Sequence, residues 1–149
     1  MKILTLGLGA FGFAINKLIW ENNLKQAYAK SLWQEEVKIY AYEINKDVVN
    51  KIKTTREHPF FFSGYKLPKN IEIIDNYDEI IWKIDLLIIA IPTQFISQTI
   101  KNIQNKLKSG VVILNLAKWI DIKSNKTISQ LIAINLKWIN YLNNKKDLY

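Results

Sequence analysis

Short apolar runs alternate along this chain with segments whose apolar residues recur every three or four positions. Short runs rich in Ile, Leu, Val and Tyr are typical of β-strands, and the longer spacing is typical of helices with one buried face. The pattern predicts strands over Lys2–Leu6, Val37–Tyr42, Ile71–Ile74, Leu86–Ile91 and Val111–Leu116. It predicts helices over Ala10–Lys25, Asn45–Lys53, Tyr77–Lys83, Phe95–Leu107 and Thr127–Ile139.

Strands that alternate with helices predict an α/β fold, built as a doubly wound parallel sheet with right-handed crossovers. The predicted strand Leu86–Ile91 is nearly pure Leu and Ile, which suits an interior strand buried on both faces. Pro92 ends it because proline cannot donate to the ladder. A length of 149 residues fits one domain. We expect that domain to cover residues 1–142, followed by a polar tail over residues 143–149.

The chain carries 21 Lys and Arg against 13 Asp and Glu, a formal net charge of +8. Such an excess suggests nucleic acid or an anionic membrane as a partner when it is concentrated on one surface. Arg56 is the single Arg, whereas nucleic-acid surfaces favour the planar guanidinium group. The chain is also rich in Ile and Asn, so we interpret the Lys excess as a compositional bias and expect no nucleic-acid partner.

No Cys and one His are present, which excludes a disulfide framework and a metal site built from thiolates or several imidazoles. The uncharged run Ile3–Asn16 lacks the basic flank and the cleavage site of a signal peptide. The run Leu86–Ile100 is interrupted by a proline and polar residues, short of the ~20 apolar residues of a membrane span. We therefore expect a cytoplasmic protein without a membrane span.

A glycine-rich motif directly follows the first predicted strand and opens the first predicted helix, which is the context of the dinucleotide fingerprint. Its first glycine permits a tight turn, its second lets the backbone approach a pyrophosphate, and its third lets helix and strand pack closely. The motif predicts a Rossmann-type site for NAD, with the phosphate at the helix N-terminus. The alternative is a turn that binds nothing. The candidate cofactor-contacting residues are Gly7, Leu8, Gly9, Ala10, Phe11 and Gly12.

An acidic residue near the end of the second strand of such a fold accepts hydrogen bonds from the adenosine ribose. Glu43 directly follows the second predicted strand, and the polar insert Lys25–Glu36 explains why it lies further from the motif than usual. A carboxylate at this point repels a 2′-phosphate, so the sequence favours NAD over NADP. The alternative is that Glu43 is a solvated turn residue and that Ile44 and Asn45 form the rim of the site.

Four further segments carry more specific information, because two of them are not general features of a Rossmann fold. They are Val37–Glu43, the loop His58–Pro68, Ile91–Ile96 and Leu116–Lys118. Together, from Met1 to about Leu136, they resemble the N-terminal domain of NAD-dependent glycerol-3-phosphate dehydrogenase. The resemblance implies a cofactor site made from the glycine turn, Tyr42 and Phe95, and a substrate-contacting Lys118. It also implies hydride transfer between NAD and glycerol 3-phosphate, giving dihydroxyacetone phosphate, as the activity of the complete enzyme.

Phe95 and Lys118 also have a physical interpretation that does not depend on the resemblance. They follow the fourth and fifth predicted strands, at the sheet edge where ligands bind in open α/β folds. The ring of Phe95 either flanks the cofactor or fills the core under the segment Thr54–Lys69. The ammonium group of Lys118 either holds a phosphate or substrate oxygen, or is one more surface charge in a Lys-rich chain.

The segment Thr54–Lys69 is the longest without predicted regular structure, and loops of that length are usually functional or mobile. In the family that the sequence resembles, this loop lies beside the cofactor cleft. A lone loop His is usually solvated, and we expect this of His58. The three consecutive residues Phe60, Phe61 and Phe62 cannot all face one side, so at least one should cover the core or pack on a partner, and an exposed remainder would form an interaction patch.

Two features depart from the family. Trp119 stands where the family has Gly after the Lys, which puts a large ring where the backbone approaches substrate. The chain also ends at Tyr149, before the family's second, helical domain, which supplies the general-base Lys and most substrate contacts. We therefore expect no catalytic residue and no metal site in this chain.

Three functional interpretations follow from the sequence. The first is the NAD-binding domain of a glycerol-3-phosphate dehydrogenase, inactive without the second domain, with glycerol 3-phosphate as its small-molecule substrate. The second is a stand-alone NAD-binding module or degenerate remnant without turnover, and the third is another two-domain reductase of the same superfamily. A second copy of the chain and the absent domain both remain open as macromolecular partners.

Overall fold

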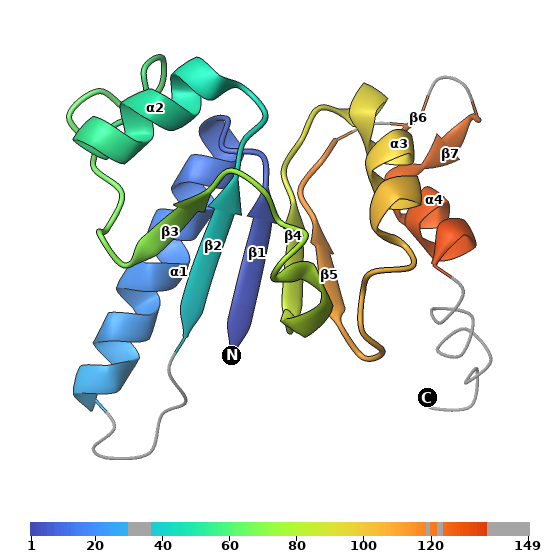
Figure 1. Cartoon of the computed structure of the whole chain (residues 1–149), viewed down its shortest axis with the longest axis horizontal. Coiled ribbons are helices and arrows are strands. Elements are labelled where there is room, and N and C mark those ends of the chain that lie inside the picture. The colour runs from blue at the N-terminus through green and yellow to red at the C-terminus, as the bar shows by residue number, and fades with distance from the viewer. Residues whose placement is uncertain (30–36, 119, 122–123, 137–149) are drawn as a thin grey trace.

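The computed structural model of the chain describes residues 1–29, 37–118, 120–121 and 124–136. Within them, five strands form one parallel sheet in the order β3-β2-β1-β4-β5 (Figure 1). The strands are β1 (Lys2–Leu6), β2 (Lys38–Tyr42), β3 (Ile71–Ile74), β4 (Leu86–Ile89) and β5 (Val112–Asn115). The chain moves outward from β1 to β3 on one side and then places β4 and β5 on the other side. The predicted doubly wound parallel sheet is confirmed.

Helices cover both faces of this sheet, as Figure 1 shows. They are α1 (Ala10–Ala29), α2 (Lys46–Thr55), α3 (Thr93–Ile103) and α4 (Ile128–Asn135), with a single 3₁₀ turn, η1 (Ile81–Lys83). The first two helices share one buried apolar cluster with the sheet, and α3 and α4 share a second cluster with the opposite face. The sheet is therefore the middle layer of three.

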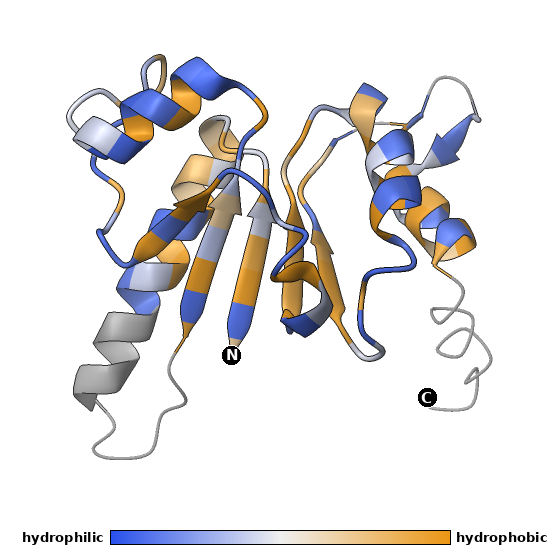
Figure 2. Ribbon diagram, in the orientation of Figure 1, coloured by the Kyte–Doolittle hydropathy of each residue, from blue (hydrophilic) through white to orange (hydrophobic). Residues whose placement is uncertain are grey.

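The two clusters follow from the alternation of side chains along each strand. In β1, Ile3 packs toward α1 and α2, whereas Leu4 and Leu6 pack toward α3 and α4. In β4, the segment Leu87–Ile89 alternates in the same way and is 0% exposed. Figure 2 shows this apolar colouring along the central strands. The prediction of an interior strand buried on both faces is confirmed for β4.

Several predicted boundaries differ from the observed ones. Helix α1 continues beyond Lys25 to Ala29, so the polar insert begins as helix. The predicted helix Tyr77–Lys83 is wrong in length, because the described helical part is only η1. Before η1, the side chain of Asn76 accepts the N–H of Asp78 at 2.9 Å and forms a tight turn instead of a helix start.

A short antiparallel pair, β6 (Ile120–Asp121) with β7 (Lys126–Thr127), was not predicted, since strands of two residues have no detectable periodicity. Helix α4 starts directly after it, where Thr127 and Gln130 form a reciprocal capping box. The predicted helix Thr127–Ile139 is observed as far as Asn135. Residues 137–139 and the predicted tail over residues 143–149 lie outside the described residues, so the domain boundary at residue 142 stays a prediction.

The turn between β1 and α1 depends on two of its glycines. Gly7 has a φ of +95°, a conformation that side chains disfavour, and its N–H donates to the Tyr42 carbonyl oxygen at 2.8 Å. A Cβ on Gly12 would lie 1.9 Å from the Gly7 carbonyl oxygen, whereas a Cβ on Gly9 would have no heavy atom within 4 Å. Gly12 is therefore required for the close packing of α1 on the turn, whereas the space in front of the Gly9 Cα is open.

Replacing Gly12 with Ala should destabilise the chain by about 1–3 kcal/mol or more, because the added methyl group forces backbone apart. The matched variant Gly9→Ala should stay within about 0.5–1 kcal/mol of the wild type. Chemical denaturation of both variants measures the difference. Equal stabilities would show that helix α1 does not need the close approach at Gly12.

Candidate functional site

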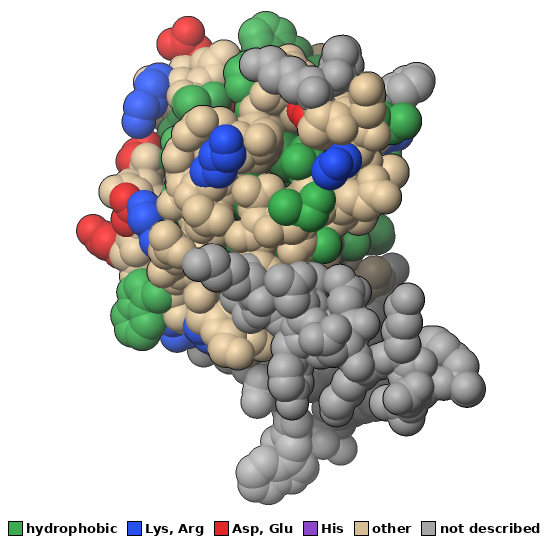
Figure 3. Space-filling view, turned by 90° about the vertical axis from the view of Figure 1, so that its right-hand side faces the viewer, with side chains coloured by type: hydrophobic (Ala, Val, Ile, Leu, Met, Phe, Trp, Pro, Cys, Tyr) green, Lys and Arg blue, Asp and Glu red, His purple; other side chains and the backbone are tan. Residues whose placement is uncertain are grey.

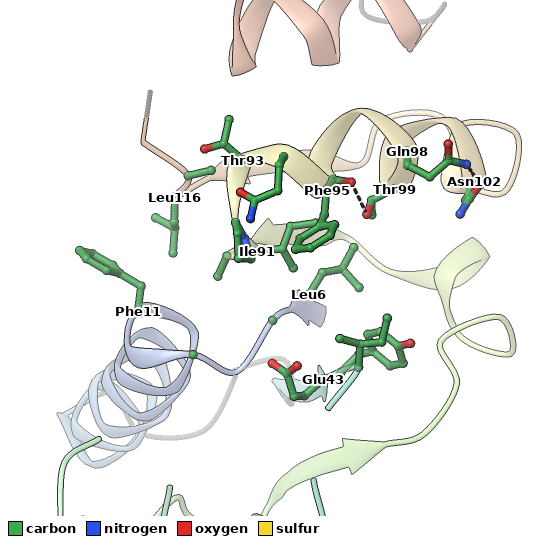
Figure 4. A pocket seen from close by; sticks show the side chains of 18 of the residues that line it. Leu6, Phe11, Glu43, Ile91, Thr93, Phe95, Gln98, Thr99, Asn102 and Leu116 are labelled. Carbon is green, nitrogen blue, oxygen red and sulfur yellow. Dashed lines mark hydrogen bonds between the residues drawn. The ribbon is translucent and has the colours of Figure 1, made fainter. Parts of the chain in front are cut away.

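A cleft of about 950 Å³ opens at the carboxyl ends of β1 and β4. The chain leaves β1 toward β2 and leaves β4 toward β5, in opposite directions, so the connections diverge above these two strands. This is the switch point at which open α/β sheets bind ligands, and the volume is within the ~300–1,000 Å³ typical of ligand pockets. Figure 4 shows the start of α1 and Glu43 on one side of the cleft and the side chains of α3 on the other.

The glycine motif contributes its backbone and one ring to this cleft. Gly7, Gly9 and Phe11 line it. The first N–H groups of α1 have no partner within the helix and carry the positive end of its dipole, which suits an anion. The other three predicted contacts are not among the lining residues: the Leu8 side chain is buried in the apolar cluster under α1, Gly12 packs on Gly7, and Ala10 lies at the helix start.

Glu43 lies at the cleft wall and is held by two backbone N–H groups. Its Oε2 accepts the N–H of Leu8 at 2.8 Å, and its Oε1 accepts the N–H of Asn45 at 3.0 Å. These bonds fix the carboxylate in the turn after β2, and the choice between a ribose-contacting residue and a solvated turn residue stays a prediction. A carboxylate has about four acceptor positions, so roughly two remain for a ligand. Ile44 also lines the cleft, whereas the Asn45 side chain caps α2.

Aromatic rings cover two sides of the cleft. Tyr42 lines it and packs edge to face on Tyr77, with the ring centroids 4.9 Å apart. Burial, reinforced by Tyr77 and Glu43, raises the pKa of the Tyr42 hydroxyl above its ordinary value. Phe95, on the first turn of α3, lines the cleft and is 58% exposed, so the alternative that it fills the core is wrong.

Lys118 and Phe11 meet at the cleft edge. The Lys118 Nζ lies 5.3 Å from the centre of the Phe11 ring, a cation–π arrangement. The hydroxyl of Thr93 donates to the Lys118 carbonyl oxygen at 2.6 Å, which joins the end of β5 to the start of α3. Trp119, the next residue, lies outside the described residues.

Several polar residues of α3 line the cleft and were not singled out from the sequence. Figure 4 shows Gln98, Thr99 and Asn102 along this helix, with Gln98 donating to Asn102 at 2.9 Å. Thr93 belongs to the same group. A signal was present, because Pro92 ends β4 and the helix that follows must begin at the ligand-bearing edge. The polar face of α3 therefore points partly into the cleft and not only to solvent.

The loop that contains His58 packs against the first turns of α1. Arg56 donates from Nε to the Leu67 carbonyl oxygen at 3.2 Å and from Nη2 to the carbonyl oxygens of Pro68 and, at 2.7 Å, Ile71. Glu57 and Lys66 form an antiparallel bridge across the loop. The loop is therefore closed at its base by the single Arg of the chain.

The expectation of a solvated His58 is wrong, because this side chain is 6% exposed. Burial lowers the pKa of the His58 imidazole below its ordinary value of 6.5, against opposing effects of Glu43 and the Leu8 backbone. Phe62 stacks on Phe13 with centroids 6.0 Å apart, and Phe60 remains 75% exposed. Phe61 and Phe62 are about equally exposed, at 43% and 44%, so Phe62 covers the buried Phe13 ring only in part. The role of the exposed rings stays a prediction.

Charged side chains are dispersed on the face of the molecule that Figure 3 shows. On the face seen in Figure 3, Lys and Arg side chains lie singly, with acidic side chains near several of them. Ion pairs join Lys106 to Asp78 and Lys108 to Asp85. Among the residues with described positions, no group of three or more His, Asp or Glu side chains suits a metal ion. None of the helices in the described part of the chain has both the length and the apolarity that a bilayer crossing needs.

Comparison with known proteins places this arrangement in a family. Residues 2–141 match the family model for the N-terminus of NAD-dependent glycerol-3-phosphate dehydrogenase. A glycerol-3-phosphate dehydrogenase [NAD(P)+] of Clostridium perfringens is 26% identical over 88% of this chain and 36% of its own length. A glycerol-3-phosphate dehydrogenase 1-like protein of Xenopus tropicalis is 32% identical over 81% of this chain and 34% of its own length.

A solved structure shows the same fold. The crystal structure of glycerol-3-phosphate dehydrogenase from Coxiella burnetii superposes with a TM-score of 0.73 at 14% identity, covering 91% of this chain and 37% of that one. The chain spans about a third of the length of the curated relatives it matches. On the match over residues 2–141, the chain belongs to the family of N-terminal domains of NAD-dependent glycerol-3-phosphate dehydrogenases.

Proposed function

We propose that the chain binds NAD in the cleft above β1 and β4 and serves as the cofactor-binding domain of a glycerol-3-phosphate dehydrogenase. One observation carries the proposal: the open N-terminus of α1 and the fixed carboxylate of Glu43 lie in the same cleft, on adjacent elements. The first suits a pyrophosphate, and the second suits ribose hydroxyls. We also propose a cytoplasmic location.

The pyrophosphate lies against the backbone of Gly7 and Gly9 in this assignment. Gly9 has open space in front of its Cα, so phosphate oxygens can approach the backbone N–H groups directly. The adenosine ribose lies beside Glu43, whose position is set by the N–H groups of Leu8 and Asn45 and needs no rearrangement on binding. A fixed acceptor loses little side-chain entropy when the ligand arrives.

The nicotinamide end of the cofactor extends toward Phe95, Thr93 and Lys118. Bound NAD supplies the hydride acceptor, while the protein sets orientation and charge. Phe95 contributes an exposed ring on one wall, and Lys118 contributes an ammonium group that can bind a substrate phosphate or polarise a substrate oxygen. The polar side chains of α3 supply further donors and acceptors between the two ends. We propose glycerol 3-phosphate as the substrate.

A second candidate, an NAD-binding module without turnover, is favoured by the small set of titratable groups in the cleft. Those among the described lining residues are Tyr42, Glu43, Tyr77 and Lys118. Glu43 is occupied with backbone N–H groups, and the raised pKa of Tyr42 makes it a weaker acid. A positioned general base typically contributes about 10²–10⁴-fold to the rate, and neither Glu43 nor Tyr42 is suited to that role.

Titration calorimetry should detect NAD binding to the folded chain, and Gly9→Val should weaken it by about tenfold or more because the side chain fills the approach to the backbone. Ala14→Val, on the exposed side of α1, is the matched control and should bind as the wild type does. Absence of binding to the folded wild type would rule out the proposal, and full affinity in Gly9→Val would remove the glycine turn from the site.

NADP should bind about tenfold or more weakly than NAD, because its 2′-phosphate meets the negative charge of Glu43. Glu43→Gln should narrow this difference, mainly by improving NADP affinity. Competition binding with both nucleotides measures the ratio, and the melting temperature of Glu43→Gln checks that the turn survives. Equal affinities in the wild type would contradict the placement of the ribose beside Glu43.

The 149-residue chain alone should not turn over glycerol 3-phosphate, even when it is saturated with NAD. Binding of NAD should still raise the melting temperature by mass action. We therefore expect a thermal shift with NAD but no turnover. NADH absorbance with purified protein measures the rate. A steady rate that Lys118→Ala abolishes and the exposed-surface variant Lys101→Ala preserves would show that this chain is a complete enzyme.

A further inference from the structure

Lys118 is the only Lys or Arg among the described residues that line the cleft, and no carboxylate pairs with it. The ion pairs of the described residues involve other lysines, such as Lys106 and Lys108. Glu43 is the only carboxylate among the described lining residues, and its two oxygens accept backbone N–H groups. The protein therefore leaves the positive charge of Lys118 available to a ligand in the cleft.

An aromatic ring holds this ammonium group in place of a carboxylate. The Lys118 Nζ lies 5.3 Å from the centre of the Phe11 ring, within the ~6 Å over which a ring face attracts a cation. Phe11 is 57% exposed and belongs to neither apolar cluster, and Figure 4 shows its ring extending from the start of α1. Because the ring is uncharged, it attracts the ammonium group without cancelling its charge.

Both ends of Lys118 are held by elements that border the cleft. At the backbone, the hydroxyl of Thr93, the first residue of α3, donates to the Lys118 carbonyl oxygen at 2.6 Å. At the ammonium end, Phe11 is the second residue of α1 and precedes Gly12, which packs against the carbonyl oxygen of Gly7. The Lys118 side chain therefore runs from the segment after β5 to the first turn of α1.

The start of α1 is an unfavourable place for a cation, because the positive end of the helix dipole lies there. The attraction between the Phe11 ring and the ammonium group opposes this repulsion and keeps Lys118 beside the helix when no anion is bound. An anion that binds there interacts with the ammonium group and with the N–H groups of the first turn. A phosphate group has the charge and the acceptor oxygens for both.

We propose that Phe11 is a positioning residue for Lys118: its ring holds the ammonium group, with its charge intact, at the point where the phosphate group of the substrate binds. The proposal rests on the proposed function, since it names the residue that sets the substrate end of the same cleft. In this role Phe11 acts through Lys118 and not through contact with the substrate.

Three substitutions separate the effect of the ring from that of its apolar bulk. Phe11→Leu keeps an apolar side chain and removes the ring face, whereas Phe11→Trp supplies the ring that attracts cations most strongly. Phe60→Leu is the matched control, because Phe60 is 75% exposed and does not line the cleft. Both positions are exposed, so all three variants should fold, and their melting temperatures check this.

Nuclear magnetic resonance of the free protein measures the contact itself. In the wild type and in Phe11→Trp, the ring current should shift the Lys118 Cε protons upfield. In Phe11→Leu these protons should return to the ordinary lysine position, and Phe60→Leu should leave them as in the wild type. Ordinary lysine shifts in the wild type would overturn the role of Phe11. The readout needs no cofactor, so a failure of the wild type to bind NAD would contradict the proposed function alone.

A titration of the free protein with inorganic phosphate, followed on the Lys118 signals, measures the consequence of the contact. Phe11→Leu should lose about two- to fivefold in phosphate affinity, the effect of one exposed cation–π contact. Phe11→Trp and Phe60→Leu should stay within about twofold of the wild type. Wild-type affinity in Phe11→Leu, a loss that also occurs in Phe11→Trp, or no response of Lys118 in the wild type would overturn the proposal.

The same titration in the presence of NAD distinguishes the two sources of phosphate in this cleft, since the cofactor's pyrophosphate and the substrate's phosphate share their chemistry. When the chain is saturated with NAD, Lys118 should still respond to inorganic phosphate, with the same order of affinities among the variants. Loss of this response would show that Lys118 binds the pyrophosphate of the cofactor, and it would overturn the assignment to the substrate.

Discussion

The close contact of Gly12 with the carbonyl oxygen of Gly7 is the constraint on which the cleft depends, because it sets how near helix α1 can come to β1. A buried polar chain supports that contact from below. Thr5 donates to the Asn16 side chain at 2.8 Å, and Asn16 donates to the Gly12 carbonyl oxygen at 2.8 Å. Both side chains are 0% exposed, so each must keep its hydrogen-bond partner. These hydrogen bonds therefore fix the distance between helix α1 and strand β1.

The distance between α1 and β1 determines which charged groups lie side by side in the cleft. The first turn of α1 offers backbone N–H groups to an anion, while the carboxylate of Glu43 stands a short distance away at the end of β2. The hydrogen bonds from Leu8 and Asn45 fix the position of Glu43. Backbone donors for the pyrophosphate and a carboxylate acceptor for the ribose hydroxyls therefore lie in the same site.

The parts of this arrangement that the sequence predicts are those that local patterns encode. The glycine motif, β1, β3 and the apolar core of β4 each carry their own signal, and the positions of Glu43 and Phe95 follow from strand ends. The burial of His58 has no such signal, because it depends on contacts between residues far apart in the sequence. His58 packs on Phe13, and Arg56 closes the loop by a hydrogen bond to Ile71. The polar lining of α3 was missed because polar residues on a helix ordinarily face solvent.

Arg56 shows how a Lys-rich chain uses its single guanidinium group. One planar fork satisfies three carbonyl oxygens at the base of the loop, which the flexible point charge of a Lys does not reproduce. This closure accompanies the packing of His58 and Phe62 on Phe13, so the loop and the first turns of α1 are in contact. Residues in contact are generally not independent in their effect on stability, so substitutions in the Thr54–Lys69 loop that remove these contacts also act on the start of helix α1.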